Sequence, residues 1–346
     1  MSRVVPSLLT LLALAACGGK DAADTGGTFT STGTATSTGT DTSGGDVFSF
    51  ALDGAVEDAA LALFAIDYTA GMEPGAALLA AAVSGGVAEV PRAVPDAGAL
   101  VPFPENTALS FALYAPLLWR DADGDLVRDD DEPFLGSGRV VMAYFDDVDE
   151  ALLAEGYRPG WNALELSMEG ERPTAVALDD LHLPLNLVVA ESLTLSGTAD
   201  GTLGDGVHVV VLGSDGQSAP DRLLADVPAT GTWTLTVSGA PDPVPTDPFL
   251  QLQATSGLYG LVTAWTDTDG SGAYSAGDAI LPVCAEGGPP SVTALWINAV
   301  TDGGDAVMMG FMGLRAGWRL MTADSGGLTS VDAATPLLAS TRCGSP

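Results

Sequence analysis

Two acidic segments of the chain carry oxygen-bearing side chains at short, regular intervals. The first covers residues 121–132 (DADGDLVRDDDE) and the second covers residues 267–278 (DTDGSGAYSAGD). In both segments, carboxylates or hydroxyls occupy the first, third, fifth, ninth and twelfth places. Calcium takes about six to eight oxygen ligands from carboxylates, carbonyls and water. This spacing therefore predicts a calcium site in each segment.

The second segment is similar to the twelve-residue calcium loop of EF-hand and dockerin proteins. The resemblance implies one ligand from each of those five places, one backbone carbonyl at the seventh place, and Gly272 at the sharp turn. The implied ligands are Asp267, Asp269, Ser271, the carbonyl of Ala273, Ser275 (directly or through water) and Asp278. Asp278 stands where EF-hand loops have Glu, and its shorter side chain favours weaker binding.

The same resemblance extends to the first segment. The implied ligands are Asp121, Asp123, Asp125, the carbonyl of Val127, Asp129 and Glu132. The sixth place departs from the pattern, because Leu126 replaces the Gly that readily takes a positive φ. The first loop thus has the more negative ligand set and the less suitable backbone. For either loop, a solvated acidic turn without an ion is the alternative.

The flanks of the second loop do not predict helices. Residues 258–265 and 279–283 show no convincing amphipathic pattern, so a calcium ion would stabilise a loop between strands. A sensor of the EF-hand type needs a helix pair that opens, which this placement does not provide. The loop and its leading strand resemble the Trp-x-Asp-x-Asp-x-Asp-Gly loops of B-type repeats in Ser-Asp-rich bacterial adhesins.

The loops belong to an internal repeat. Leu113-Tyr114 and Trp119 recur as Leu258-Tyr259 and Trp265. Further along, VVMAYF (140–145) is echoed by VTALWI (292–297), and RPGW (158–161) by RAGW (315–318). These landmarks occur in the same order and predict two related domains, 47–188 and 189–346; chance similarity of Gly- and Ala-rich sequence is the alternative. Recurrence of the Trp residues favours core packing over stacking on sugar rings.

Each repeat has the pattern of β structure. Residues 47–52 and 232–237 alternate between apolar and polar side chains, and residues 207–212 form a β-branched run. We therefore predict a mainly β chain with two tandem antiparallel β-sandwich domains, Ig-like or transthyretin-like. A single barrel of residues 47–346 is the alternative. One helix is expected over residues 147–155, between Asp146 as N-cap and Gly156.

The amino terminus predicts export and lipidation. Residues 1–16 have a short basic start and an apolar stretch, as expected of a secretory signal peptide. Leu14-Ala15-Ala16-Cys17 resembles the bacterial lipobox, which implies a diacylglycerol thioether on Cys17 and cleavage before it. An ordinary signal peptide is the alternative. The resemblance also implies the outer rather than the inner membrane, because Gly18 and not Asp follows the cysteine.

Composition defines what surrounds the lipid anchor. Residues 17–46 are rich in Gly, Thr and Ser and predict a disordered tether after the lipidated Cys. The chain has 45 acidic and 12 basic residues, which argues against a nucleic-acid partner. Cys284 and Cys343 form an even pair in an exported chain and predict a disulfide bond, with a metal pair or two free thiols as the alternative.

Catalytic motifs are missing from the sequence. The only histidines are His182 and His208, and no HExxH, G-x-S-x-G or P-loop motif occurs. We therefore predict a non-enzymatic, calcium-stabilised cell-envelope lipoprotein with a structural or interaction role. A glycan- or protein-binding surface module is the first alternative, which Phe249, Tyr274 or Trp233 would support if exposed. A carboxylate-based hydrolase is a more distant one.

Overall fold

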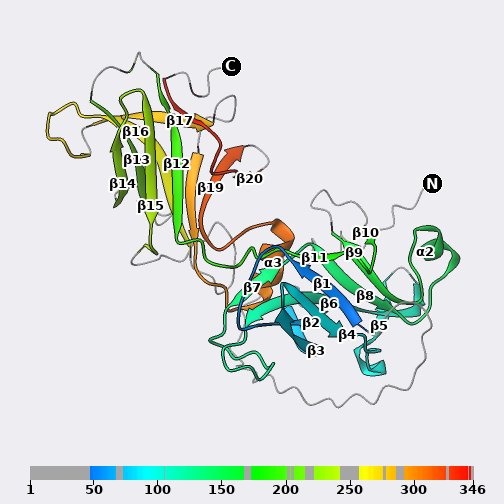
Figure 1. Cartoon of the computed structure of the whole chain (residues 1–346). Helices are drawn as coiled ribbons and strands as arrows, with labels where there is room; N and C mark the ends of the chain where they lie inside the picture. Colours follow the sequence, from blue (N-terminus) through cyan, green and yellow to red (C-terminus); the bar gives the residue numbers. More distant parts are fainter. Residues whose placement is uncertain are drawn as a thin grey trace, which may run out of the picture. The chain divides into compact units, whose positions relative to one another are not determined.

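The computed structural model describes most of the chain after residue 46. The described residues are 47–67, 73–104, 106–166, 173–200, 203, 206–214, 222–241, 257–275, 278–285, 292–324, 327–341 and 343. The predicted signal peptide, Cys17 and the tether lie outside them. The described chain is mainly β, as predicted, and divides into two compact units (Figure 1). The first unit comprises residues up to Leu187 together with Val300–Leu314, and the second comprises Val188–Ala299 and Arg315–Pro346.

The first unit contains a sheet of eleven described strands. They are β1 (Val47–Leu52), β2 (Ala59–Asp67), β3 (Glu73–Ser84), β4 (Val87–Pro91), β5 (Val101–Phe103), β6 (Asn106–Arg120), β7 (Phe134–Ser137), β8 (Val140–Phe145), β9 (Gly160–Glu165), β10 (Thr174–Val176) and β11 (Leu181–Leu183). Their order is β10-β9-β8-β6-β2-β3-β4-β1-β11, with β5 and β7 also paired to β6. A short 3-10 helix, η1 (Ala97–Ala99), precedes β5.

The second unit contains a sheet of ten described strands. They are β12 (Ser192–Ala199), β13 (Val207–Ser214), β14 (Arg222–Pro228), β15 (Thr232–Ser238), β16 (Gly257–Thr266), β17 (Ala279–Ala285), β18 (Val292–Ile297), β19 (Gly317–Asp324), β20 (Gly327–Val331) and β21 (Leu337–Ala339). The strands β1, β13 and β15 include the three segments that the sequence predicted as strands, residues 47–52, 207–212 and 232–237.

The two units have the same order of strand pairing. The first strand of each pairs antiparallel with the fourth and parallel with the last, β1 with β4 and β11, and β12 with β15 and β21. The ladder β3-β2-β6-β8-β9-β10 has its counterpart in β14-β13-β16-β18-β19-β20. The segments that repeat in the sequence therefore lie on corresponding strands: β6 and β16, β8 and β18, and β9 and β19.

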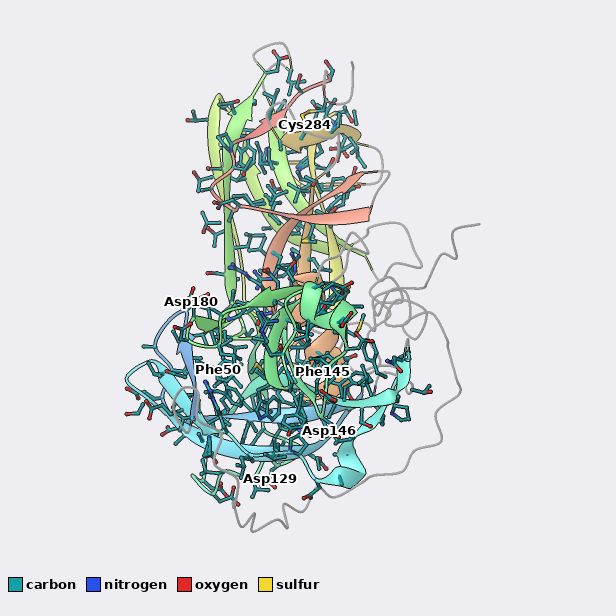
Figure 2. All side chains as sticks on the ribbon, turned by 90° about the vertical axis from the view of Figure 1, so that its right-hand side faces the viewer. Phe50, Asp129, Phe145, Asp146, Asp180 and Cys284 are labelled. Atoms are coloured by element: carbon teal, nitrogen blue, oxygen red, sulfur yellow. A yellow bond between two sulfur atoms is a disulfide. The ribbon has the colours of Figure 1, made fainter. Side chains whose placement is uncertain are left out.

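Each unit encloses its own apolar core, because one strand in each leaves the main ladder to join a second set of strands. In the first unit β3 pairs with β2 and then, through Val83 and Ser84, with β4. In the second unit β17 pairs with β16 and then, through residues 283–285, with β21. The first core includes Phe50, and Phe145 is buried in the same unit (Figure 2).

The predicted helix at 147–155 is shorter than expected and begins later. The helix α2 covers Glu150–Ala154, and Asp149 rather than Asp146 caps it by accepting a hydrogen bond from the Leu152 N–H. Asp147 instead accepts a bond from the adjacent Val148 N–H, which belongs to a local turn and not to a helix. Gly156 follows the end of the helix with φ of 99°, so the predicted end is close to the observed one.

A second helix, α3 (Gly303–Met312), was not predicted, although its sequence carries end signals. Asp302 caps it by accepting a bond from the Asp305 N–H, and Gly313 ends it with φ of 66°. Its connection after β18 matches that of α2 after β8, but α3 belongs to the first unit and lies beside β7 (Figure 1). The sequence-based domain boundary at 188/189 was therefore incomplete, because it assigned residues 300–314 to the second domain, whereas they belong to the first unit.

Specific contacts hold residues 300–314 in the first unit. The Phe134 N–H donates to the Val300 carbonyl at 2.7 Å, and Arg139 Nε donates to the Phe311 carbonyl at 3.1 Å. The buried Asn186 amide donates to the Leu314 carbonyl. The returning segment thus completes the unit by bonds to both strands and loops.

Candidate metal sites

The two Asp-rich loops occupy corresponding places in the two units. The first connects β6 to β7, and the second connects β16 to β17. In each case the second-to-last residue of the strand before the loop is a buried tryptophan, Trp119 in β6 and Trp265 in β16. The loops are therefore flanked by strands and not by a pair of helices.

In the first loop, the fold brings together carboxylates from both ends of the segment. One oxygen each from Asp121, Asp123 and Glu132 lie within 4.8 Å of one another. Asp121 and Glu132 are only 5% and 8% exposed, so these two charges are largely removed from water. Burying like charges this close is unfavourable unless a cation or hydrogen bonds compensate.

The second loop forms an equivalent cluster. One oxygen each from Asp267, Asp269 and Asp278 lie within 4.8 Å of one another, and Asp278 is 9% exposed. The clustered residues are those at the first, third and twelfth places in both loops. Although Asp278 has a shorter side chain than Glu132, it reaches the carboxylates at the first and third places of its own loop, as Glu132 does in the first loop.

Both loops have the same internal hydrogen bonds. The N–H at the second place donates to the carboxylate at the twelfth, Ala122 to Glu132 at 2.8 Å and Thr268 to Asp278 at 3.1 Å. The N–H at the sixth place donates to the carboxylate at the first, and the N–H at the ninth donates to the carboxylate at the twelfth. The backbone path that the resemblance implies for a calcium loop therefore recurs in both units.

Leu126 adopts the backbone conformation that its loop position requires. Its φ is 62°, against 72° for Gly272 at the same place of the second loop. A left-handed conformation costs a non-Gly residue about 1–2 kcal/mol. The surrounding hydrogen bonds impose that conformation on Leu126, so the expected departure in geometry is not observed.

Other predicted ligands take part in hydrogen bonds within the loops. Asp125 accepts a bond from the Val127 N–H at 2.7 Å, and the Asp129 N–H donates to Glu132. In the second loop, the Ser271 hydroxyl donates to the carbonyl of Ala273 at 2.9 Å, and the Ser275 hydroxyl reaches Asp269 at 3.5 Å.

Hydrogen bonds favour the ionised form of two carboxylates in the second loop. Bonds from the Ser271 side chain and N–H lower the pKa of Asp269. Burial raises the pKa of Asp278, but bonds from Thr268 and Ser275 outweigh it and hold that pKa below its usual value. The ionised form of Asp269 and Asp278 is thus favoured, and ionised carboxylates are the form that binds a hard cation.

The repeated tryptophans belong mainly to the cores. Trp119, Trp265 and Trp318 are buried, and the half-buried Trp161 packs edge-on against Phe48 with ring centroids 5.2 Å apart. The indole N–H groups of Trp161 and Trp318 donate to carbonyls that follow the fourth strand of their units, those of Ala93 and Gly239. These contacts agree with the predicted core role.

Of the three aromatic residues that would have marked a binding surface, the two that the structure describes are not exposed. Trp233 is buried, and the half-buried Tyr274 packs against Trp265 with ring centroids 5.9 Å apart. Phe249 lies outside the described residues. His208 is half-buried in β13, where it bonds to Asp226 at 2.8 Å and stacks on Trp265, as a satisfied strand residue would.

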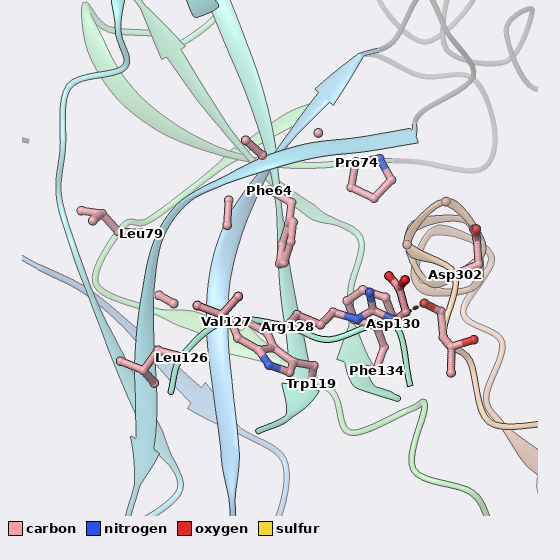
Figure 3. Close-up of a pocket in the computed structure, with 17 residues that line it drawn as sticks. Phe64, Pro74, Leu79, Trp119, Leu126, Val127, Arg128, Asp130, Phe134 and Asp302 are labelled. Carbon is pink, nitrogen blue, oxygen red and sulfur yellow. Dashed lines mark hydrogen bonds between the residues drawn. The ribbon is translucent and has the colours of Figure 1, made fainter. Parts of the chain in front are cut away.

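The first unit also contains a cavity that the sequence did not predict. It has a volume of about 450 Å³ and lies between β3, the first Asp-rich loop and the start of α3 (Figure 3). Its lining combines aromatic side chains with one guanidinium, that of Arg128, and two acidic residues, Asp130 and Asp302. The residues come from three regions far apart in the sequence, and so no local pattern identifies them.

The predicted disulfide is confirmed. Cys284 of β17 bonds to Cys343, with a Cα–Cα distance of 5.7 Å and a sequence separation of 59 residues. Comparisons with protein-family models, with curated proteins and with solved structures found no match for the chain. Within the described residues, every helix is too short or too polar to span a membrane.

Proposed function

We propose that the chain is a non-enzymatic lipoprotein of the cell envelope whose two β units are stabilised by calcium. The observation that carries this proposal is the agreement of the two loops. Each brings carboxylates at its first, third and twelfth places within 4.8 Å, through the same backbone hydrogen bonds. Burial of Asp121, Glu132 and Asp278 beside other carboxylates supports a bound cation, because a cation would offset their mutual repulsion.

Calcium would act on stability through electrostatics. Without a cation, the clustered carboxylates repel one another and oppose the folded geometry of the loops. A ligand that binds the native state alone stabilises it by RT ln(1 + [L]/Kd). Extracellular calcium sites bind at about 10⁻⁴ to 10⁻³ M, so millimolar calcium would contribute about 1 kcal/mol per site.

Lipid anchorage is the second component of the proposal. It rests on the lipobox-like Leu14-Ala15-Ala16-Cys17, on Gly18, and on the Gly-, Thr- and Ser-rich tether before β1. The outer membrane is the proposed location, on its periplasmic face or at the cell surface. The disulfide between Cys284 and Cys343 supports an oxidising compartment. The partner implied by the anchor is the membrane, and the charge of −33 disfavours nucleic acid.

Thermal melts of the mature chain test the calcium component. Asp121→Asn and Asp267→Asn each remove one charge from one cluster and keep one of the two oxygens that accept backbone hydrogen bonds. Calcium should raise the melting temperature of the unmodified protein, magnesium should do so less, and each variant should lose its own unit's share. Glu89→Gln is the matched control, because Glu89 is an exposed acid of the first unit outside the loops. Equal midpoints with chelator, calcium and magnesium contradict the proposal.

Anchorage is tested separately. Cys17→Ser should release the protein from membranes or leave an unprocessed precursor, as measured by detergent-phase partitioning and by mass. Unchanged partitioning and mass contradict the lipoprotein assignment and leave the calcium component intact.

A further inference from the structure

The cavity of the first unit has the size and lining of a small-molecule site. Ligand pockets commonly measure about 300–1,000 Å³ and combine apolar walls with a few polar groups, and the volume here is about 450 Å³. Its aromatic wall is formed by Phe64, Trp119 and Phe134, and β3 adds small residues such as Ala77 (Figure 3). A flat or branched apolar group therefore fits this wall.

Arg128 supplies one buried hydrogen-bond donor of the cavity, and the Trp119 indole N–H is another without a partner among the described residues. Its guanidinium lies over the Phe134 ring at 4.2 Å from the centroid, and one of its terminal nitrogens donates to the Thr301 carbonyl. The Nε–H is buried and has no hydrogen-bond partner in the described part of the chain. Burial lowers the pKa of Arg128, against the opposing effect of carboxylates that include Asp130 and Asp302. An oxygen acceptor from a ligand would satisfy this buried donor.

The wall that carries Arg128 is part of the first Asp-rich loop. Leu126, Val127, Arg128 and Asp130 line the cavity, while Asp121, Asp123 and Glu132 of the same loop form the carboxylate cluster. An ion that fixes the loop would also fix the position of Arg128. Ordering a binding surface in advance removes part of the free-energy cost of binding.

The second loop carries a different side chain at the place of Arg128. Tyr274 occupies the eighth place of the second loop, where Arg128 stands in the first. Its ring packs against a small cluster of Val210, Leu212 and Trp265. At this loop place the second unit therefore has a packed tyrosine ring, whereas the first has a guanidinium that borders the cavity.

We propose that the cavity beside the first Asp-rich loop binds a small organic molecule with a flat apolar group and an oxygen acceptor. The apolar group packs against Phe64, Trp119 and Phe134, and the acceptor faces Arg128. Calcium in the loop raises the affinity by holding Arg128 in place. Only this calcium dependence rests on the proposed function; the ligand site itself does not.

Three indole derivatives of similar size test the ligand class on the full mature chain. Indole-3-acetamide and indole-3-acetate offer an oxygen acceptor, whereas tryptamine offers an ammonium group. Binding measured by protein-observed NMR or calorimetry in calcium should be about tenfold tighter for the two acceptors, since a hydrogen bond to a charged donor contributes at that level. Equal or tighter binding of tryptamine, or no binding of any probe at millimolar concentration, overturns the proposal.

Variants locate the site. Arg128→Ala should weaken indole-3-acetamide about tenfold and leave tryptamine unchanged. Arg92→Ala is the matched control, because Arg92 also lies over a phenylalanine of the first unit, Phe48 at 4.8 Å, but does not line the cavity. Ala77→Phe should block the cavity to all probes, with a thermal melt to verify folding. Unchanged acetamide affinity in both Arg128→Ala and a folded Ala77→Phe overturns the location.

Calcium dependence completes the experiment. The affinity for indole-3-acetamide should fall when calcium is replaced by chelator, and Asp267→Asn should leave this fall unchanged because it alters only the second loop. Equal affinity with calcium and chelator overturns the coupling. If calcium stabilises the protein in melts while this affinity stays constant, the calcium proposal stands and the coupling alone fails.

Discussion

The two units share one order of strand pairing, but different additional features stabilise them. The first is completed by residues 300–314, which return from a distant part of the sequence and bond to β7 and its neighbours. The second is completed by a disulfide that links β17 to a residue beyond β21. Their loops also differ at the eighth place, where Arg128 borders a cavity and Tyr274 packs against Trp265 and its apolar neighbours. Two units with the same strand pairing can therefore differ in the contacts that stabilise them and in the side chains of their loops.

Loss of the disulfide should have the largest effect on this comparison. Cys284→Ser combined with Cys343→Ser removes a link that closes a loop with a separation of 59 residues. In the chain-entropy model, such a loop contributes about 4 kcal/mol to the free energy of unfolding. Hydrogen exchange measured by mass spectrometry should show faster opening of the second unit and little change in the first. Equal changes in both units would mean that the two do not unfold separately.

A substitution in α3 can disturb the contact of residues 300–314 with the rest of the first unit. A Cβ at Gly310 of α3 would lie 2.7 Å from the Cβ of Ser137 in β7, closer than side chains pack. Gly310→Val should therefore destabilise the first unit by about 1–3 kcal/mol, as overpacking does. Gly98→Ala is the control, since nothing lies within 4 Å of its Cβ. Hydrogen exchange that is unchanged in β7 would show that α3 does not stabilise this unit.

The sequence predicted what depends on local pattern and failed where distant segments meet. Alternating side chains located β1 and β15, and the repeat placed both loops between strands. The same local reasoning started α2 too early, because Asp146, Asp147 and Asp149 are equivalent caps until the fold selects one. The docking of α3 in the first unit depends on contacts across more than a hundred residues, such as that between Arg139 and Phe311.

The candidate sites show the same division. Spacing alone identified the places that form both carboxylate clusters, because a twelve-residue loop brings its own ends together. Leu126 departs from the Gly of the pattern, yet it adopts a positive φ like Gly272, and its N–H donates to Asp121 as that of Gly272 does to Asp267. The cavity combines β3, the loop and the start of α3, and only the folded chain brings these together.

Exchanging the sixth-place residues sharpens the comparison of the loops. Gly272→Leu should destabilise the second unit by about 1–2 kcal/mol, because Leu must adopt the left-handed conformation. Leu126→Gly relieves the same strain in the first unit, but the added freedom of Gly in the unfolded chain offsets about 0.5–1 kcal/mol of the gain. Urea unfolding followed by a probe in each unit should therefore show a clear loss for Gly272→Leu and a small change for Leu126→Gly. Equal and opposite changes would argue that the loops are interchangeable.

The smallest expected effect concerns the N-terminal cap of α2. This helix follows β8 in the first unit as α3 follows β18 in the chain of the second. A hydrogen bond from the Leu152 N–H and one from the Asn106 amide, 3.1 Å from Asp149, lower the pKa of this carboxyl. A lowered pKa in the folded state means that the charged form binds its donors better when folded, so this stabilisation is present above the unfolded value of about 3.9. It is lost as the pH falls through the lower folded value. Asp149→Asn keeps a side-chain oxygen for the cap but cannot titrate. The difference in free energy of unfolding between the unmodified protein and the variant should therefore become smaller as the pH falls from 6 to below the folded-state pKa of Asp149. A difference that stays constant over this range would show that the charge of Asp149 does not stabilise the helix, and that α2 is held by its packing alone.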